Sequence, residues 1–380
     1  MLTKTSTQLM KDKLLPKEKA EEGATPWIYC QLIYVVINAF LSTYYDTSSE
    51  ITDSFDLEPN FLNTAWQAFI PALTIGLVLS ICQGKCYKAQ SKHFNDAKNK
   101  KLPALSVQED VQAPSKKNSF SNKALAFTHY LAEVNNDIQP MVALIKLAEL
   151  NLTPWQWRFS YLGIAVFSLS GNILELITTF IALKEEDGDE HNNNSDSHKT
   201  WKCLQFVKNM LNTFLKTNYT VGSLVTELAN LEKFFLGISW QGYVVAMPLA
   251  MFFSACESVC HDAESDHFIT NHPVESDVEN PPLATEVKDS TPQLTTSQHI
   301  FNYGHYCSDI VEGLAAPLAT AKKLKVESLS IIPKVCIYMG MSVYSFFGNM
   351  QEFKNTRTAF LDKNLKNTKS SSAPKAIAHS

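Results

Sequence analysis

The chain has 380 residues, of which 45% are hydrophobic and 19% charged, and its formal net charge is −5. The charged fraction lies below the ~25% of typical soluble domains. This favours either a membrane protein with polar linkers or a helical protein whose central helices are buried away from water. The basic residues form no Arg-rich or Lys-aromatic stripe, so we expect no nucleic-acid partner. The eight cysteines form no CxxC motif and no dense disulfide spacing, so we expect reduced thiols.

The order of segments along the chain indicates an internal duplication. Residues 1–26 form a polar N-terminal segment without the apolar core of a signal peptide. Helical repeat A follows at 27–183, and an acidic linker at 184–200 is too polar to bury. Helical repeat B occupies 201–362, and the tail 363–380 is predicted to be disordered.

The duplication is carried by two aligned blocks. Residues 27–94 align with 201–268 at an offset of 174 without a gap, and 23 of the 68 positions are identical. Residues 139–183 align with 316–360 at an offset of 177, with 13 identities in 45 positions. Identity near one third without gaps predicts that the two copies share one fold.

Each copy divides into four predicted helices. No stretch alternates apolar and polar residues between turn signals, so we expect no strands. The predicted fold is all-α, with two tandem four-helix repeats related by a pseudo-two-fold axis. The expected helices are 27–45, 62–94, 122–150 and 155–183 in the first copy and 201–219, 236–268, 299–325 and 332–360 in the second.

The second helix of each copy is the strongest candidate for a membrane span. It carries no charge from Thr64 to Cys82 or from Phe234 to Cys256, which is long enough to cross a ~30 Å hydrocarbon layer. The fourth helices are weaker spans, because each holds an acid. The helix at 201–219 has lysines on one broad side and is typical of a surface helix. We therefore predict a multi-pass membrane protein with membrane lipid as a partner, and keep a cytoplasmic protein as the alternative.

Charge in the linkers suggests how the copies are oriented. Residues 85–118 hold eight lysines against three acids, whereas residues 259–298 hold one lysine against eight acids. Because positive loops favour the cytoplasmic side, this contrast predicts copies inserted in opposite orientations. Neutral drift of exposed loops would give the same contrast.

One face of the fourth helix is identical in the two copies. Small residues on such a face let another backbone approach, which predicts a packing seam between helices or between copies. The Asn and Glu within this apolar segment suggest a substrate or ion path instead, because a buried carboxylate is costly unless it is paired. The path residues would be Asn172, Glu175, Asn349 and Glu352. The whole face comprises Ser168, Gly171, Asn172, Glu175, Thr179 and Ala182, with Ser345, Gly348, Asn349, Glu352, Thr356 and Ala359 in the second copy.

A second repeated stripe lies on the second helix and raises the question of a metal site. Thiols and imidazoles are good metal ligands, but a histidine nearly two turns beyond the last cysteine lies about 10 Å along the axis. Packing is therefore the preferred interpretation, because Cys is also a common small core residue. The candidate metal ligands are Cys82, Cys86 and His93, repeated as Cys256, Cys260 and His267. The third helix of each copy could add His129 and Asp137, or His305 and Asp309.

The sequence contains no GxGxxG, P-loop, HExxH, GxSxG or EF-hand pattern, so it favours no enzyme and predicts no cofactor. The leading prediction is a multi-pass membrane protein that moves a small solute or ion. The alternatives are a soluble all-α interaction protein whose halves pack through the repeated stripe, and a metal- or haem-binding helical protein.

Overall fold

The computed structural model describes residues 25–59, 64–100, 119–147, 152–186, 199–270 and 293–372. Most of the predicted N-terminal segment and acidic linker, and the last eight residues of the tail, lie outside these ranges. Every named element in the described residues is a helix, and Phe235 and Ile238 form an isolated β-bridge. The all-α prediction is therefore confirmed.

The helices follow the predicted order. Those of the first half are α2 (Thr25–Ser54), α3 (Trp66–Lys100), α4 (Ser119–Leu147), α5 (Pro154–Gly171) and α6 (Ile173–Glu186). Those of the second half are α7 (Lys199–Leu228), α8 (Trp240–Thr270), α9 (Thr296–Glu312), α10 (Ala315–Lys323), the 3₁₀ turn η2 (Val326–Ser328), α11 (Ile331–Gly348) and α12 (Met350–Ser372).

Several boundaries differ from the predicted ones. The fourth helices are not continuous: each breaks at an asparagine, and the bend between α5 and α6 is 48°. At the first break Asn172 Nδ2 donates to the backbone oxygen of Ser168 at 3.0 Å, and Asn349 does the same to Ser345 at 3.1 Å. An Asn side chain that bonds nearby backbone in this way competes with the helix. Helix α12 also continues to Ser372, so residues 363–372 of the predicted disordered tail are helical.

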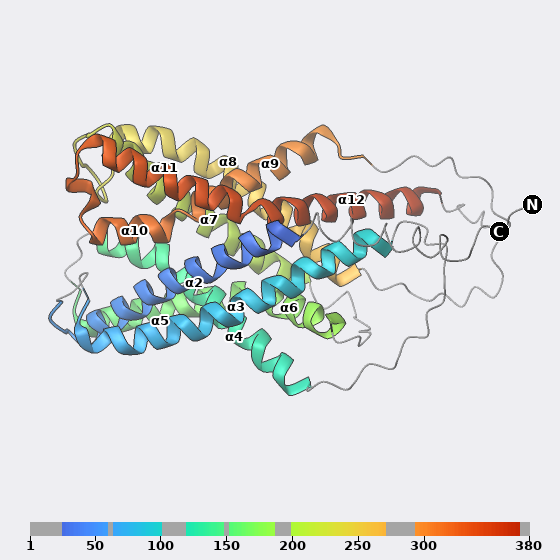
Figure 1. Ribbon diagram of the computed structural model, residues 1–380, viewed down its shortest axis with the longest axis horizontal. Coiled ribbons are helices and arrows are strands. Elements are labelled where there is room, and N and C mark those ends of the chain that lie inside the picture. Colours follow the sequence, from blue (N-terminus) through green and yellow to red (C-terminus); the bar gives the residue numbers. More distant parts are fainter. Residues whose placement is uncertain are drawn as a thin grey trace, which may run out of the picture.

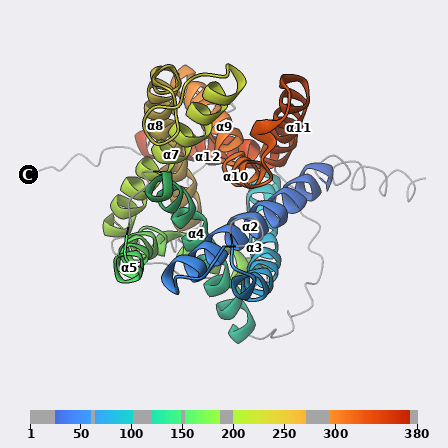
Figure 2. The same cartoon turned by 90° about the vertical axis from the view of Figure 1, so that its left-hand side faces the viewer.

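Equivalent ends of the two halves lie at the same end of the molecule. In Figure 1 the α2–α3 and α7–α8 connections both lie at the left, and α3, α5, α8 and α11 all run from that end. Figure 2 looks from that end and places α3 across the centre from α8, and α5 across from α11. The opposite orientation predicted from linker charge is therefore wrong. Each half makes four passes along the bundle, an even number, so the chain starts its second half at the end where it started the first.

Hydrogen bonds of the first half recur in the second. Ser91 Oγ donates to Gln31 Oε1 at 2.8 Å, and Ser265 Oγ donates to Gln205 Oε1 at 3.1 Å. The hydroxyl of Tyr130 donates to the backbone oxygen of Leu169 at 2.7 Å. Tyr306 and Phe346 make the same bond at 2.7 Å. Within each half, the helices are thus bonded to one another at corresponding points.

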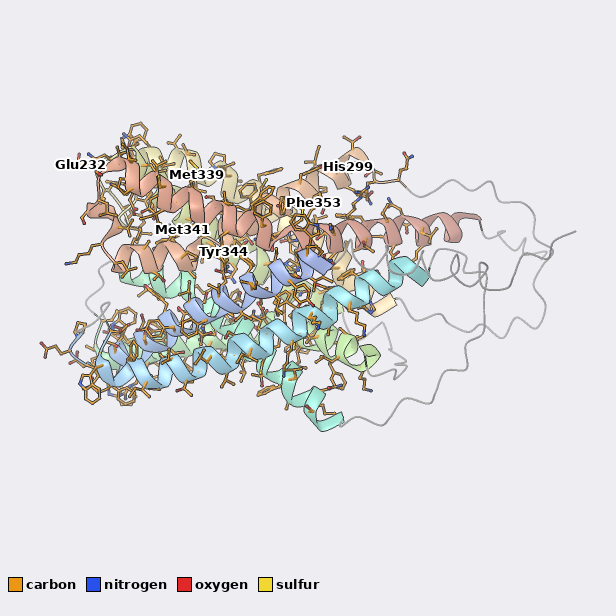
Figure 3. The ribbon with its side chains drawn as sticks, in the orientation of Figure 1. Glu232, His299, Met339, Met341, Tyr344 and Phe353 are labelled. Carbon is orange, nitrogen blue, oxygen red and sulfur yellow. The ribbon has the colours of Figure 1, made fainter. Side chains whose placement is uncertain are left out.

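The bundle turns large apolar side chains outward and polar ones inward. Ile332 and Met251 are 73% and 67% exposed, whereas Asp137 and Asn172 are buried. Figure 3 shows side chains along the whole of α11, where Met339 is exposed and the Tyr344 hydroxyl donates to the backbone oxygen of Tyr34 on α2. Water-soluble bundles have the reverse distribution.

Four helices in the described residues are long and apolar enough to cross a membrane: α2, α3, α8 and the joined α11–α12. The bent pair α5–α6 would be a fifth. Helix α7 is not among them, as its sequence predicts. The expected surface helix is wrong, however: Lys208 is buried and Val207 is 49% exposed, because the lysines of α7 pair with acids inside the bundle. These lengths and the outward apolar side chains are consistent with a helical membrane protein.

Candidate functional site

A polar cavity of about 240 Å³ lies between the two halves and is lined by both. Eight carboxyl groups, two lysines and two histidines line it, so acidic side chains outnumber basic ones by four. The carboxylates are Glu133, Asp137, Glu175, Glu257, Glu264, Asp309, Glu312 and Glu352, and the lysines are Lys208 and Lys216.

The first helix of each half reaches the helix break of the other half. On α2, the Tyr34 hydroxyl lies 3.3 Å from Ser345 Oγ and accepts from Asn349 Nδ2 at 3.0 Å, beside the α11–α12 break. On α7, Lys208 Nζ donates to Asn172 Oδ1 at 3.0 Å, beside the α5–α6 break. Tyr34 and Lys208 are 174 residues apart, so aligned positions make the two crossings.

The four residues predicted for a substrate or ion path all line this cavity. Glu175 accepts from Gln90 Nε2 of α3 at 2.8 Å, and Glu352 accepts from Gln31 Nε2 of α2 at 3.2 Å. Each carboxylate thus finds a partner on a facing helix, as the sequence predicts for a seam. The other members of the stripe, among them Gly171 and Ala182, are buried against neighbouring helices. Seam and cavity wall are therefore parts of the same face.

Two lysines of α7 are paired with acids of the cavity. Lys208 Nζ lies 3.4 Å from Asp137 Oδ2, and Lys216 Nζ lies 3.2 Å from Glu312 Oε2. These pairs neutralise two of the eight acids and leave the rest to other partners.

In the first half the remaining acids are held by neutral amides, a phenol and one histidine. Glu133 accepts from Gln83, and from the Tyr87 hydroxyl at 3.1 Å. Glu175 lies 3.5 Å from His129 Nε2 in addition to its bond from Gln90. Two carboxylates are thus surrounded by hydrogen-bond donors.

In the second half the same region holds four carboxylates and two histidines. Glu257 Oε2 lies 2.7 Å from His305 Nδ1, and Glu257 Oε1 lies 2.9 Å from His261 Nε2. His261 Nδ1 is 3.5 Å from Glu264 Oε2, and His305 Nε2 is 3.7 Å from Asp309 Oδ2. Ligand atoms lie within 4.8 Å of one another in two sets that share one histidine: Glu257, His261 and His305, and Glu264, His305 and Glu352.

The residues predicted as metal ligands on the second helices have other surroundings. The rings of His93 and His267 lie 5.2 Å apart, each stacked on a phenylalanine of the other half. The Cys86 and Cys260 thiols donate to backbone oxygens of α4 and α9. Among the described residues, two sets of side chains are close enough to share one ion, the sets that contain His305. Neither set contains any of these six predicted ligands.

The sequence contained a signal for the second-half cluster that the search for identities missed. Three cavity positions on the second helix differ between the copies: Gln83, Tyr87 and Gln90 become Glu257, His261 and Glu264. They are spaced i, i+4 and i+7, so they share one helix face. Neutral residues replaced by three titratable ones on one face would have indicated a site.

No family model, curated protein or solved structure matches this chain.

Proposed function

We propose that this chain is a multi-pass membrane protein that binds and moves a small cation through the cavity between two duplicated four-pass halves. The observation that carries the proposal is the distribution of polarity: an acid-rich cavity at the centre of a bundle whose outer surface is apolar. Carboxylates inside a membrane bundle are costly, and they often mark the path of an ion or substrate.

Contacts between aligned residues support the duplication and its two-fold axis. The ring of His93 stacks on Phe268 at 4.5 Å, and the ring of Phe94 stacks on His267 at 4.6 Å. Position i of one half therefore meets position j of the other and the reverse, as at a two-fold interface. The placement of the helices in Figure 2 agrees, with the axis along the bundle. Parallel repeats about the membrane normal are a known transporter plan.

Three tryptophans support insertion in a bilayer. Trp66, Trp155 and Trp240 stand in the first turns of α3, α5 and α8, and are 64%, 65% and 61% exposed. These helices begin at the same end of the bundle (Figure 1). Exposed indoles gathered at one level are typical of the interface between membrane and water.

The charge of the cavity favours a cation as the solute. Asp137 and Glu312 are paired with lysines, whereas Glu257 and Glu264 form ion pairs with histidines. A negative cavity in a low-dielectric bundle attracts cations and repels anions. An anionic solute would be repelled by the carboxylates of the cavity.

Fractionation and uptake test the proposal in sequence. Expressed protein should stay in the pellet after alkaline carbonate extraction, and release into the soluble fraction without detergent would favour the soluble alternative. Purified protein in liposomes should then take up a cation from a panel of Na⁺, K⁺, Mg²⁺, Ca²⁺, Zn²⁺ and Mn²⁺. Protein-free liposomes serve as the control. Uptake no faster than in those vesicles for the whole panel would contradict transport of simple ions.

A further inference from the structure

We propose that the second half holds a binding site for one divalent first-row transition-metal ion, formed by Glu257, His261 and His305 with Glu264 and Glu352 beside them, and that the first half has no such site. The inference rests on the proposed function, because it names the class of cation that the cavity takes.

Three helices bring the ligands together. Glu257, His261 and Glu264 lie on one face of α8, His305 lies on α9 and Glu352 lies near the start of α12. Tertiary packing therefore fixes the ligand positions. Tetrahedral zinc with bonds of 2.0–2.2 Å holds its ligand atoms roughly 3.4 Å apart, and the two sets present here lie within 4.8 Å. Small side-chain movements would close either set around an ion.

Unsatisfied atoms in the cluster point independently to a ligand. His305 is fully buried, and its Nε2 makes no hydrogen bond among the described residues; the group that it faces is the Oδ2 of Asp309 at 3.7 Å, which makes none either. Both residues line the cavity. Buried polar atoms are normally satisfied, so an unsatisfied imidazole nitrogen in a polar cavity is a vacant donor to an ion or water.

The donor set selects the class of ion. Imidazole nitrogen suits zinc, iron and nickel, while sites for Mg²⁺ and Ca²⁺ are built from oxygen alone. Two histidines with one glutamate form a known zinc donor set. The thiols of Cys256 and Cys260 lie on the neighbouring stripe of α8 and belong to neither set. We therefore infer a nitrogen–oxygen site with zinc as its most suitable probe.

The first half provides an internal comparison. At its aligned positions Gln83 and Tyr87 donate to Glu133, and Gln90 donates to Glu175. These donors engage one oxygen, Oε1, of each carboxylate that an ion would need. The chain thus contains two versions of one architecture. The first half places one histidine, His129, beside its acids, whereas the second places both His261 and His305 against Glu257. Among the described residues, only the second version brings three ligand atoms within 4.8 Å of one another.

The test exchanges the two versions. The variant Glu257→Gln, His261→Tyr, Glu264→Gln installs the residues of the first half in the second, a combination that this architecture already accommodates. The reverse variant is Gln83→Glu, Tyr87→His, Gln90→Glu. Control variants are His299→Gln, at an exposed position near the start of α9, and Glu232→Gln, at an exposed position before α8. Figure 3 labels both control residues.

Full-length protein in detergent is stripped with a chelator, and bound Zn²⁺ is counted by elemental analysis after dialysis. We expect one Zn²⁺ per chain in the unaltered protein and both controls, none in the first variant and two in the reverse variant. Excess Mg²⁺ or Ca²⁺ should not displace the ion. No bound Zn²⁺ in the unaltered protein, or one ion retained by the first variant, overturns the site.

Two further measurements keep the result interpretable. If the first variant does not fold, His305→Gln should weaken Zn²⁺ binding by more than the ~10–100-fold of an outer-shell change. Bound Co²⁺ should show no thiolate charge-transfer absorption, and a strong thiolate band would move the site to the cysteines. Cation uptake without Zn²⁺ binding would end this inference and leave the transport proposal standing. Zn²⁺ binding without uptake of any ion would contradict the transport proposal and leave the metal site standing.

Discussion

Gly171 at the end of α5 lies directly against Lys208 of α7, so closely that a Cβ at position 171 would stand 2.5 Å from both the Cβ and the Cγ of Lys208. The aligned Gly348 lies against Tyr34 of α2, and a Cβ there would overlap the tyrosine ring. Both glycines thus permit the crossings that bring the first helix of one half to the helix break of the other.

Replacing these glycines should destabilise the bundle. Gly171→Ala and Gly348→Ala place a methyl group where a packed side chain already lies, and overpacking of this kind costs about 1–3 kcal/mol. The control variants are Gly163→Ala and Gly340→Ala, which meet no atom within 4 Å. Because alanine has a higher helix propensity than glycine, each control variant should be more stable than the unaltered protein by about 1 kcal/mol. Thermal unfolding in detergent measures both pairs, and equal midpoints in all four would contradict the tight crossing.

The double variant Glu175→Gln, Glu352→Gln should fold and lose uptake. Each carboxylate accepts a hydrogen bond from a glutamine, at 2.8 and 3.2 Å, and an amide oxygen can accept the same bond. The ionisable carboxyl groups are lost, however, and ionisable groups are what a cation path needs. Size-exclusion elution and liposome uptake are the two readouts, with Glu232→Gln as the control. A variant with normal elution and full uptake would remove both residues from the path.

Removing the charge of Lys208 should destabilise the protein strongly. Lys208 Nζ lies 3.4 Å from Asp137 Oδ2, and both side chains are at most 10% exposed. Breaking a buried pair by removing one partner costs about 3–5 kcal/mol, because the other charge is left without compensation. Lys208→Met should therefore lower the unfolding midpoint. Adding Asp137→Asn should recover part of the loss, since it removes the uncompensated charge. If the stability losses of the two single variants simply add in the double variant, the ion pair contributes nothing to stability.

The turns after α2 and α7 should lie on one side of the membrane. Asp56 and Asn230 are aligned, exposed and both have a φ of 51°, a left-handed conformation that Asp and Asn tolerate. Single cysteines at these positions, in a background with the eight native cysteines replaced by alanine, should react equally with an impermeant maleimide added to sealed vesicles. Detergent-opened vesicles give the full-labelling control. Labelling of only one position before opening would restore the inverted arrangement.

Much of the architecture followed from the sequence, because helix formation depends on local patterns. The long uncharged runs in α3 and α8 predicted spans, and the absence of alternating patterns predicted the lack of strands. The identical face of the fourth helix predicted buried partners for Glu175 and Glu352, since a repeated polar residue in an apolar helix needs one. The sequence also predicted, correctly, that α7 would be less apolar than α2.

Only the tertiary structure decided how these parts meet. Linker charge gave the wrong relative orientation, because loop charge is a weak constraint and the even number of passes per half decides the direction of the chain. The breaks at Asn172 and Asn349 depend on an Asn side chain bonding backbone one turn away, which spacing does not show. The cluster of Glu257, His305 and Glu352 joins three helices up to 95 residues apart in sequence. Its ligands became neighbours only through packing, and no periodicity within a single helix encodes such a contact.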